Sequence, residues 1–354
     1  MSHFSYNKVQ HPFFDTLQKR VYDYFDKNKI EMSGGWRLWS KAMFYIVASI
    51  TNYWLMVWVV PAGAWSILLC ITMGLLLAGI GFNVMHDGAH GAFSKYKWVN
   101  NVMGFSLNFM GGDVNLWKIK HNLIHHSFTN VEGLDDDIDV EPYIRTNPYQ
   151  EKKKMHRFQH LYVSFLYSMT YLNWIWWADF EKYFTQKVGG VKFRKMDFKS
   201  HLSFWTGKIG FLVLALVIPI IMVGWLKALV GFAIVAATTG VLIALVFQVA
   251  HVVEQTTFMN ADDKSTQDEW AVTQQKGTAN FATSNRIVLF FTGGLNHQIE
   301  HHLFPRISHV HYPKVSEIVK DTCKEFGIQY HEYKTFIGAV ASHYAHLRNM
   351  GLAA

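Results

Sequence analysis

Four long apolar runs constrain the fold of this chain more than any other feature of its sequence. Each lacks a charged side chain and reaches the length of about 17–25 residues that a helix needs to cross a bilayer. The runs are Phe44–Val60, Ala64–Val84, Ile209–Trp225 and Ala228–Ala250. Inside a membrane every backbone group must find a partner within the protein, which favours helices and excludes open sheets. The sequence therefore predicts an all-α integral membrane protein with four transmembrane helices.

Short links join these runs into two helical hairpins. Residues 61–63 connect the first two runs, and Leu226 and Lys227 connect the last two. Lys227 is the only basic residue at either tip, whereas basic clusters such as Lys152–Lys154 lie outside the hairpins. Since Lys and Arg accumulate in the cytoplasmic loops of membrane proteins, we expect both termini and the long middle segment to be cytoplasmic.

Three further segments carry helical patterns of a different kind. Leu161–Trp177 is uncharged but crowded with Tyr and Trp, which prefer the headgroup level, and Val99–Met110 is short and interrupted by Asn. Neither segment is expected to cross the membrane. Phe13–Ile30 places apolar residues at helical spacing among charged ones. It is expected to lie on the membrane surface or, alternatively, to pack against the cytosolic part.

The chain is accordingly expected to have three parts. Residues 1–41 form a cytosolic or interfacial segment, residues 42–350 form the main domain with both hairpins, and residues 351–354 form a short tail. The mostly helical stretch that follows residue 250 is expected to form a cytosolic cap.

Histidine is abundant and clustered, whereas cysteine is nearly absent. The chain has 19 His and 2 Cys. Two cysteines are too few for an Fe–S cluster or a zinc ribbon, so any metal chemistry must use imidazole and carboxylate ligands. The clustered residues are His86, His90, His121, His125, His126, His251, His301 and His302.

The spacing of these histidines indicates a metal site. On an α-helix, residues four apart share one face and lie about 6 Å apart along the axis. His86 with His90, and His121 with His125, can therefore each converge on an ion.

Two adjacent doublets, His125–His126 and His301–His302, suggest more than one ion. Adjacent residues differ by roughly 100° around a helix axis, so each doublet is expected to be divided between two ions. Eight histidines and Gln298 would then surround a dinuclear centre.

The predicted topology supports this interpretation independently of the spacing. A single His pair at i,i+4 is often incidental, but a chain with four spans places every histidine cluster on the same side of the membrane. A crossing by Leu161–Trp177 or Val99–Met110 would separate the clusters.

Ligand type alone does not identify the metal, because imidazole suits Fe, Zn, Cu and Ni. A zinc hydrolase would usually show His-Glu-x-x-His, and this motif is absent. Two ions in a nitrogen-rich shell at a membrane surface favour oxygen chemistry over hydrolysis.

The histidine clusters, their order and their flanks resemble those of membrane-bound fatty acid desaturases, and most closely the front-end, linoleoyl-CoA (delta-6-like) branch. The resemblance covers residues 36–350. It rests on His86–His90, on His121–His126 with Thr129, Asn130 and Asp135–Asp139, on Trp270, Gln274, Thr278 and Asn280, and on Gly293–Pro305. It implies that the eight clustered histidines bind two iron ions. Gln298 stands where other desaturases have a histidine, so the resemblance implies that it lies at or near one iron.

Several acids, an amide and further histidines lie close in sequence to the potential ligands and could orient them. A metal-bound His generally donates its second ring N–H to a carboxylate, carbonyl or water. Candidate supports of this kind are Asp87, Asp137, Asp139, Asn280 and Glu300. Asp135 and Asp136 are expected to be solvated acids or helix caps. His297, where the family usually has an aromatic residue, is expected to pack or to support a ligand, and His309 and His311 to lie at the surface or to support one.

The resemblance implies an O2-dependent fatty acyl desaturase that introduces a cis double bond, with front-end regiochemistry, into an acyl chain on CoA or a lipid. No protein side chain is basic enough to take a proton from an unactivated C–H bond, so the metal centre must supply that step. We therefore expect no catalytic residue beyond the metal site, and the sequence singles out no substrate-binding residue.

Each turnover also needs two electrons from outside the chain. The sequence has no Gly-x-Gly-x-x-Gly, no His-Pro-Gly-Gly haem motif and too few Cys for a cluster. A ferredoxin or a separate cytochrome b5 is therefore the expected donor. The net charge of +7 suits an acidic donor, but positive-inside topology and anionic lipids explain it equally well. Short termini without a haem domain favour a bacterial inner membrane over the endoplasmic reticulum.

Two other functions are compatible with the sequence. A hydroxylase, ketolase or acetylenase on the same di-iron scaffold shares the first hydrogen abstraction. A non-catalytic membrane protein that binds or transports metal is the second alternative. A transport path needs ionisable residues within the spans, and the four apolar runs contain no Asp, Glu, Lys, Arg or His. The basic residues flank the membrane, so nucleic acid is not an expected partner.

Overall fold

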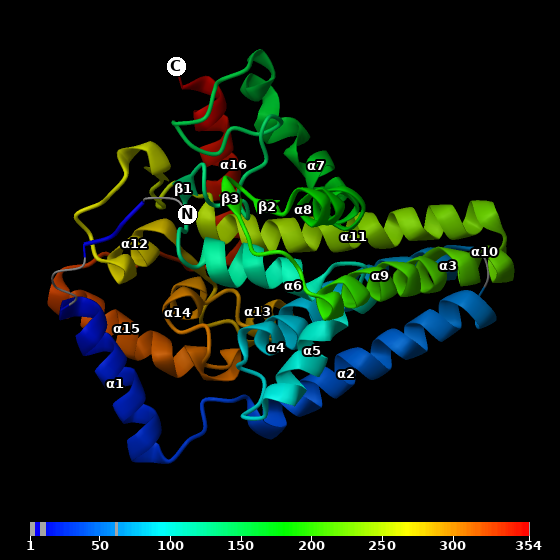
Figure 1. Ribbon diagram of the computed structural model, residues 1–354, viewed down its shortest axis with the longest axis horizontal. Coiled ribbons are helices and arrows are strands. Elements are labelled where there is room, and N and C mark those ends of the chain that lie inside the picture. The colour runs from blue at the N-terminus through cyan, green and yellow to red at the C-terminus, as the bar shows by residue number, and fades with distance from the viewer. Residues whose placement is uncertain (1–3, 8–11, 61–62, 354) are drawn as a thin grey trace.

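A computed structural model describes residues 4–7, 12–60 and 63–353 of the chain. Figure 1 shows long helices that extend together toward one side and a cap of shorter helices on the other. Within the described residues, four helical segments are long and apolar enough to cross a membrane: Gly35–Val59, Ala64–His90, Phe198–Val223 and Trp225–His251. The predicted all-α fold with four membrane-length helices in two hairpins is confirmed.

Three of these segments contain a π-helical turn, and one is continuous. The first joins α2 (Gly35–Trp54) to a π turn at Leu55–Val59. The second joins α3 (Ala64–Ile80), a π turn at Gly81–Met85 and α4 (His86–His90). The third joins α9 (Phe198–Leu212), a π turn at Val213–Val217 and α10 (Ile218–Val223), and the fourth is α11 (Trp225–His251).

The first three helices extend beyond their apolar runs at the ends that face the cap, whereas Trp225–His251 extends by three residues at the hairpin tip and by His251 at the cap end. A helix of 27 residues, such as Ala64–His90 or Trp225–His251, is about 40 Å long at 1.5 Å per residue. The hydrocarbon core is only ~30 Å thick. With the apolar runs placed in the core, the turn that carries His86 and His90 projects beyond it, and His251 lies directly after the end of its run.

The remaining elements surround the ends of the hairpins. The other α-helices are α1 (Pro12–Asn28), α5 (Lys97–Phe109), α6 (Val114–Trp117), α7 (Gln159–Asn173), α8 (Asp179–Thr185), α12 (Trp270–Gly277), α13 (Arg286–Thr292), α14 (Gln298–Leu303), α15 (Tyr312–Phe326) and α16 (Phe336–Leu352). π-helical segments lie at Lys118–His125 and Trp174–Ala178, and 3₁₀ turns at Lys154–Phe158, Ala261–Asp263 and His309–His311.

Six very short strands form three two-stranded ladders in the described part of the chain. β1 (Val131–Glu132) pairs in parallel with β4 (Met259–Asn260), and β5 (Asn280–Phe281) pairs in parallel with β6 (Glu332–Tyr333). β2 (Lys187–Val188) pairs antiparallel with β3 (Val191–Lys192). The first two ladders join segments far apart in sequence, so they fasten the loops around the histidine-bearing elements.

The N-terminal helix α1 does not lie with its apolar face on the membrane surface, and the structure corrects that expectation. Its apolar side chains Phe13, Leu17, Val21 and Phe25 are at most 2% exposed and belong to one core cluster with residues of α14 and α15. Burial of these side chains against other helices removes them from water and from lipid alike. The alternative expectation, packing against the cap, describes α1 correctly.

The aromatic helix α7 packs along α11. Tyr167 and Tyr171 are buried, whereas Leu161 and Phe165 on its other face are more than 60% exposed. Gly240 permits the close approach, since a Cβ there would lie 2.7 Å from the Tyr167 carbonyl oxygen. Small residues have this role where membrane helices cross. Within the described residues, neither α7 nor α5 is among the membrane-length helices, as the sequence predicted.

Candidate metal centre

All eight clustered histidines meet at one place, where the projecting helix ends face the cap. They come from α4, from the π-helical segment Lys118–His125 and the residue after it, from the end of α11, and from α14. Each of the eight side chains is at most 9% exposed. Gln298, the first residue of α14, is 1% exposed and lies beside them.

The potential ligand atoms form two main groups, within each of which all atoms lie less than 4.8 Å apart. One group contains His86, His90, His121 and His301, and the other contains His125, His251 and His302. His126 lies within the same distance of both His301 and His302. The two groups share no residue and meet at His126, so the arrangement offers two neighbouring metal positions.

The helix type around His121 differs from the expected α-helix. An α-helix would place His121 and His125 on one face. Lys118–His125 is instead π-helical, and the His126 amide donates to the His121 carbonyl five residues earlier. The wider turn brings the Nε2 atoms of His121 and His126 to 3.3 Å. His125 lies with His251 and His302 in the second group. His121 and His125 also lie within 4.8 Å of each other beside Asp137, so their convergence on one ion stays a prediction.

Unpaired ring nitrogens show that the site fits metal ions. In the described structure, the Nε2 atoms of five ligand candidates are buried without a hydrogen-bond partner: those of His86, His90, His125, His301 and His302. A buried polar atom without a partner is costly and rare in folded proteins. Because these nitrogens are neutral electron-pair donors that converge on the same space, metal ions would satisfy them together.

The opposite ring nitrogens have protein partners that fix the orientation of the rings. Nδ1 lies 2.7 Å from Asp137 Oδ2 in His121, 2.8 Å from Asp135 Oδ1 in His125, 3.2 Å from the Gly277 carbonyl oxygen in His251, 3.2 Å from Tyr312 Oη in His301 and 2.8 Å from Gln274 Oε1 in His302. A proton on Nδ1 leaves the lone pair of Nε2 directed into the site, which is how metal-binding histidines are generally held.

Asp135 corrects a prediction, because it was expected to be a solvated acid or a helix cap. Its carboxylate is buried and accepts from Nδ1 of His125 through both oxygens, at 2.8 and 2.9 Å. Asp136, which received the same interpretation, instead pairs with Lys182 at 2.9 Å. The carboxylate of Asp137 contacts His121, as one of the candidate supports was expected to do.

The other candidate supports have different partners, so their expected direct bonds to ligand rings are corrected. Glu300 accepts from Asn280 Nδ2 at 2.7 Å and from Tyr330 Oη at 2.9 Å, and Asn280 Oδ1 accepts from the Ile299 amide. Asp139 accepts from the Glu141 amide and from Gln150. These bonds anchor the backbone of α14 and the loop before α7, and they support the ligands only through the chain.

Asp87 contacts His309, a residue that was expected to lie at the surface or to support a ligand. Its carboxylate accepts from His309 Nδ1 at 2.9 Å and from Ser308 Oγ at 2.7 Å. His309 is 1% exposed, so the expectation of a surface position is wrong for this residue. His311 donates to the Ser33 carbonyl at 3.1 Å, and His297 is buried next to Gln298.

Charge state in the site follows from burial and from the two acids. Burial and the neighbouring histidines lower the pKa of His126, His301 and His302 well below the ordinary value, so these rings are neutral. Burial alone would lower the pKa of His125, but Asp135 raises it above the ordinary value. Burial would likewise raise the pKa of Asp137, but Lys120 and His121 lower it strongly. The neutral rings of His126, His301 and His302 near the ionised Asp137 carboxylate suit cation binding.

Two contacts near the ligands were not anticipated. Trp117 stacks on His121 with ring centroids 4.4 Å apart and also touches the edges of His86 and His90. Gln274 accepts from Thr129 Oγ1 at 2.8 Å while it holds His302. Gln274 and Thr129 belong to the stretches that carry the family resemblance, and that was the available signal. For Trp117 its position four residues before His121 was the only sign.

Gln298 lies beside the second group. Its Nε2 is 2.9 Å from His251 Nε2, and its Oε1 is buried without a partner in the described structure. The two ends of an amide are interchangeable by rotation. The carbonyl oxygen of Gln298 can therefore face an ion held by His125, His251 and His302.

Comparison with known proteins adds independent information. Residues 62–334 match the family described as Fatty acid desaturase. The chain is 36% identical to the sn-1 linoleoyl-lipid 6-desaturase of Arthrospira platensis, over 95% of this chain and 92% of that protein. It is also 36% identical to the protein of the same name from Synechocystis sp. (strain ATCC 27184 / PCC 6803 / Kazusa), over 95% of both. The Acyl-lipid (8-3)-desaturase of Physcomitrium patens is 35% identical, over 96% of this chain and 72% of that protein.

Proposed function

The chain belongs to the fatty acid desaturase family and is a multi-pass membrane oxidoreductase that acts on fatty acyl chains, and we propose that it is a front-end desaturase of lipid-linked acyl groups. The names of the cited relatives specify lipid-linked substrates, which supports a glycerolipid over acyl-CoA. The observation that carries the catalytic part of the proposal is the convergence of unpaired Nε2 atoms from five buried histidines.

We propose iron as the metal. His86, His90, His121 and His301 would hold one ion, His125, His251, His302 and Gln298 the other, and His126 lies within reach of both. With O2, two such ions supply the oxidising power to remove hydrogen from an unactivated C–H bond.

The chain itself orients the ligands and excludes water. Asp135 and Asp137 hold His125 and His121 in a fixed tautomer, and Trp117 covers one side of the first group. The nearly complete burial of these residues keeps bulk water away from the reacting chain.

The electrons are proposed to come from a ferredoxin or a cytochrome b5. The two cysteines, Cys70 in α3 and Cys323 in α15, are both buried and not disulfide-bonded, and two cysteines are too few to hold an Fe–S cluster within the chain. The active site is proposed to face the cytoplasm, because the basic residues lie mainly on the cap side of the hairpins.

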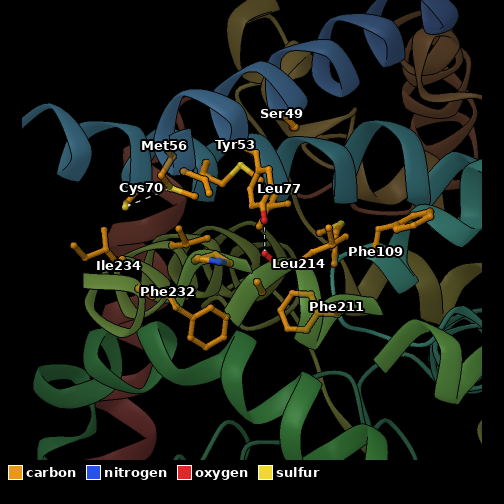
Figure 2. Close-up of a pocket in the computed structure, with 18 of the residues that line it drawn as sticks. Ser49, Tyr53, Met56, Cys70, Leu77, Phe109, Phe211, Leu214, Phe232 and Ile234 are labelled. Carbon is orange, nitrogen blue, oxygen red and sulfur yellow. Dashed lines mark hydrogen bonds between the residues drawn. The ribbon is translucent and has the colours of Figure 1, made fainter. Parts of the chain in front are cut away.

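A cavity between the two hairpins supports an acyl substrate. It has a volume of about 930 Å³, at the upper end of the ~300–1,000 Å³ typical of ligand pockets. Figure 2 shows its lining of mainly apolar side chains, with Tyr53 donating to the Leu214 carbonyl. Cys70, Leu77 and Val84 follow one face of the second membrane segment along the cavity.

The position of the cavity defines the direction of the proposed substrate. Val84 lies two residues before His86, so the cavity leads toward the metal centre. The polar end of a lipid must stay at the aqueous boundary. We infer that the reacting carbons lie near the centre and that the methyl end of the chain extends into the cavity.

A phenylalanine at Gly231 is expected to shorten the cavity. A Cβ on Gly231 in α11 would lie 3.3 Å from Cys70 Sγ on the adjacent helix α3, and both residues line the cavity. The phenyl ring would occupy space that the methyl end of a long chain needs. Gly231→Phe should therefore lower desaturation of long acyl chains about tenfold, equivalent to ~1.4 kcal/mol of binding, while shorter chains are still converted. The measurement is the product yield from supplied fatty acids of increasing length.

Ala233→Phe is the matched control, since Ala233 is exposed on the same helix and does not line the cavity. It should leave the chain-length profile unchanged. Equal conversion of long chains by Gly231→Phe and the native protein would contradict the proposed placement of the substrate.

The fatty-acid profile of an expressing host tests the proposed function. With linoleate supplied, gas chromatography and mass spectrometry should show a new cis double bond on the carboxyl side of the existing ones, mainly in glycerolipids. Hydroxylated acids without a new double bond would instead indicate a hydroxylase. A new bond on the methyl side would contradict the front-end assignment.

The pair of Asp135 and His125 offers a test of the ligand assignment. Asp135→Asn removes the charge that orients His125, and loss of such a partner typically costs about 10–100-fold in metal affinity or activity. Iron affinity of the purified protein and product yield should both fall within that range. Asp136→Asn changes a neighbouring acid that pairs with Lys182 and should change neither quantity. Equal losses in both variants would contradict the assignment.

A further inference from the structure

Lys41 is a buried cation in the first membrane-length helix. It lies in α2, is 8% exposed, and places Nζ 3.1 Å from His309 Nε2 and 4.8 Å from the centre of the Phe290 ring. Ionisable side chains in such helices are costly and commonly have a functional role with an identifiable partner. The partner here is a histidine of the cap, and Lys41 is not used by the site described above.

A row of hydrogen-bonded side chains, called the file below, leads from Lys41 through His309 to Asp87 on α4, the helix that carries His86. A lysine ammonium can only donate, so Nε2 of His309 accepts from Lys41 and Nδ1 donates to Asp87 Oδ1 at 2.9 Å. Asp87 Oδ2 also accepts from Ser308 Oγ at 2.7 Å. The file joins α2, the turn His309–His311 and α4, and it places a buried cation and a buried carboxylate on either side of His309.

Asp87 lies on α4 between the two potential ligands His86 and His90. It follows His86 directly and precedes His90 by three residues, so its side chain points about 100° away from that of His86. A second face of α4 is pressed against α5, since a Cβ on Gly88 would lie 2.6 Å from the Gly104 nitrogen. With Asp87 held toward His309, both His86 and His90 face the first group of ligands.

We propose that Lys41 and His309 are positioning residues, which act through Asp87 to orient His86 and His90 at the first metal position. This inference rests on the proposed function, because it concerns the same centre. The network should act on one position only. His86 and His90 belong to the first group alone, while His125, His251 and His302 are held by other partners.

The iron content of purified protein tests the proposal. The native protein, loaded with Fe²⁺ in detergent, should bind two ions per chain. Lys41→Met keeps the apolar stem of the side chain and removes the charge, and His309→Gln breaks the file at its centre. Each variant should lose at least about tenfold in affinity at one position and retain close to one ion per chain, with the optical spectrum of a mononuclear site. Lys41→Arg should restore two ions.

Arg37→Met is the control, because it removes a positive charge from an exposed position one turn earlier on α2. It should bind two ions. Two ions with the native spectrum in both Lys41→Met and His309→Gln would overturn the proposal, as would loss of both ions or aggregation of both variants while Arg37→Met stays sound. A native protein that binds no iron would count against the proposed function instead, which keeps the two failures distinguishable.

Discussion

His301→Ala should abolish the new double bond and strongly reduce bound iron. His301 lies within 4.8 Å of the ligand atoms of His86, His90 and His121, and also of those of His126 and His302. Loss of an outer partner of a metal ligand costs about 10–100-fold, so the loss of a shared ligand should exceed about 100-fold in product yield. Gas chromatography of host lipids and elemental analysis of purified protein measure the two effects.

His331→Ala is the control for this experiment. His331 is also buried, at 6% exposure, but it belongs to neither group of potential ligands. Its replacement should leave iron content and product nearly unchanged. If His301→Ala still made the native product, the assigned centre would be wrong.

Lys208→Met should lower the free energy of unfolding by about 3–5 kcal/mol. Lys208 Nζ donates to Asp179 Oδ2 at 2.8 Å, to the Gly111 carbonyl at 2.6 Å and to the Ile175 carbonyl at 2.7 Å. Removal of the cation would leave the buried Asp179 carboxylate unpaired, and such a loss costs about 3–5 kcal/mol. Unfolding in mixed micelles should show a free energy of unfolding lower by that amount.

A double substitution separates the charge from the packing. Replacement of a whole buried ion pair by apolar residues is often nearly neutral, so Lys208→Met with Asp179→Leu should recover much of the lost stability. Lys199→Met, at an exposed position of the same helix, is the control and should remain close to the native protein. Native stability in Lys208→Met alone would show that the ion pair contributes little.

The membrane part of the fold could be predicted from the sequence because it depends on the length and charge of continuous segments. Uncharged runs of sufficient length and two very short links determine four helices in two hairpins, and the structure has them. The meeting of eight histidines followed from the same count. Spacing of four residues was informative for His86 and His90, which lie on an α-helix.

The remainder depended on contacts that no local pattern records. The π-helical segment Lys118–His125 brings His126 beside His121, and π-helical segments are too rare to be expected from spacing alone. The amphipathic pattern of α1 is the same whether its apolar face meets lipid or α15. Asp135 could not be distinguished from a solvated acid, because its partner is fixed only when the loop folds back on His125.

Because the helices that carry His86, His90 and His251 are longer than the hydrocarbon core, the thickness of the bilayer affects the height of the metal centre above the core. These rods of about 40 Å are longer than the ~30 Å hydrocarbon core, so the height of the centre above the core depends on how far they tilt. Helices respond to a thicker or thinner bilayer by changing tilt at a modest cost per ångström. The depth to which an acyl chain must rise to reach the histidines is therefore set jointly by the protein and by the thickness of its host membrane.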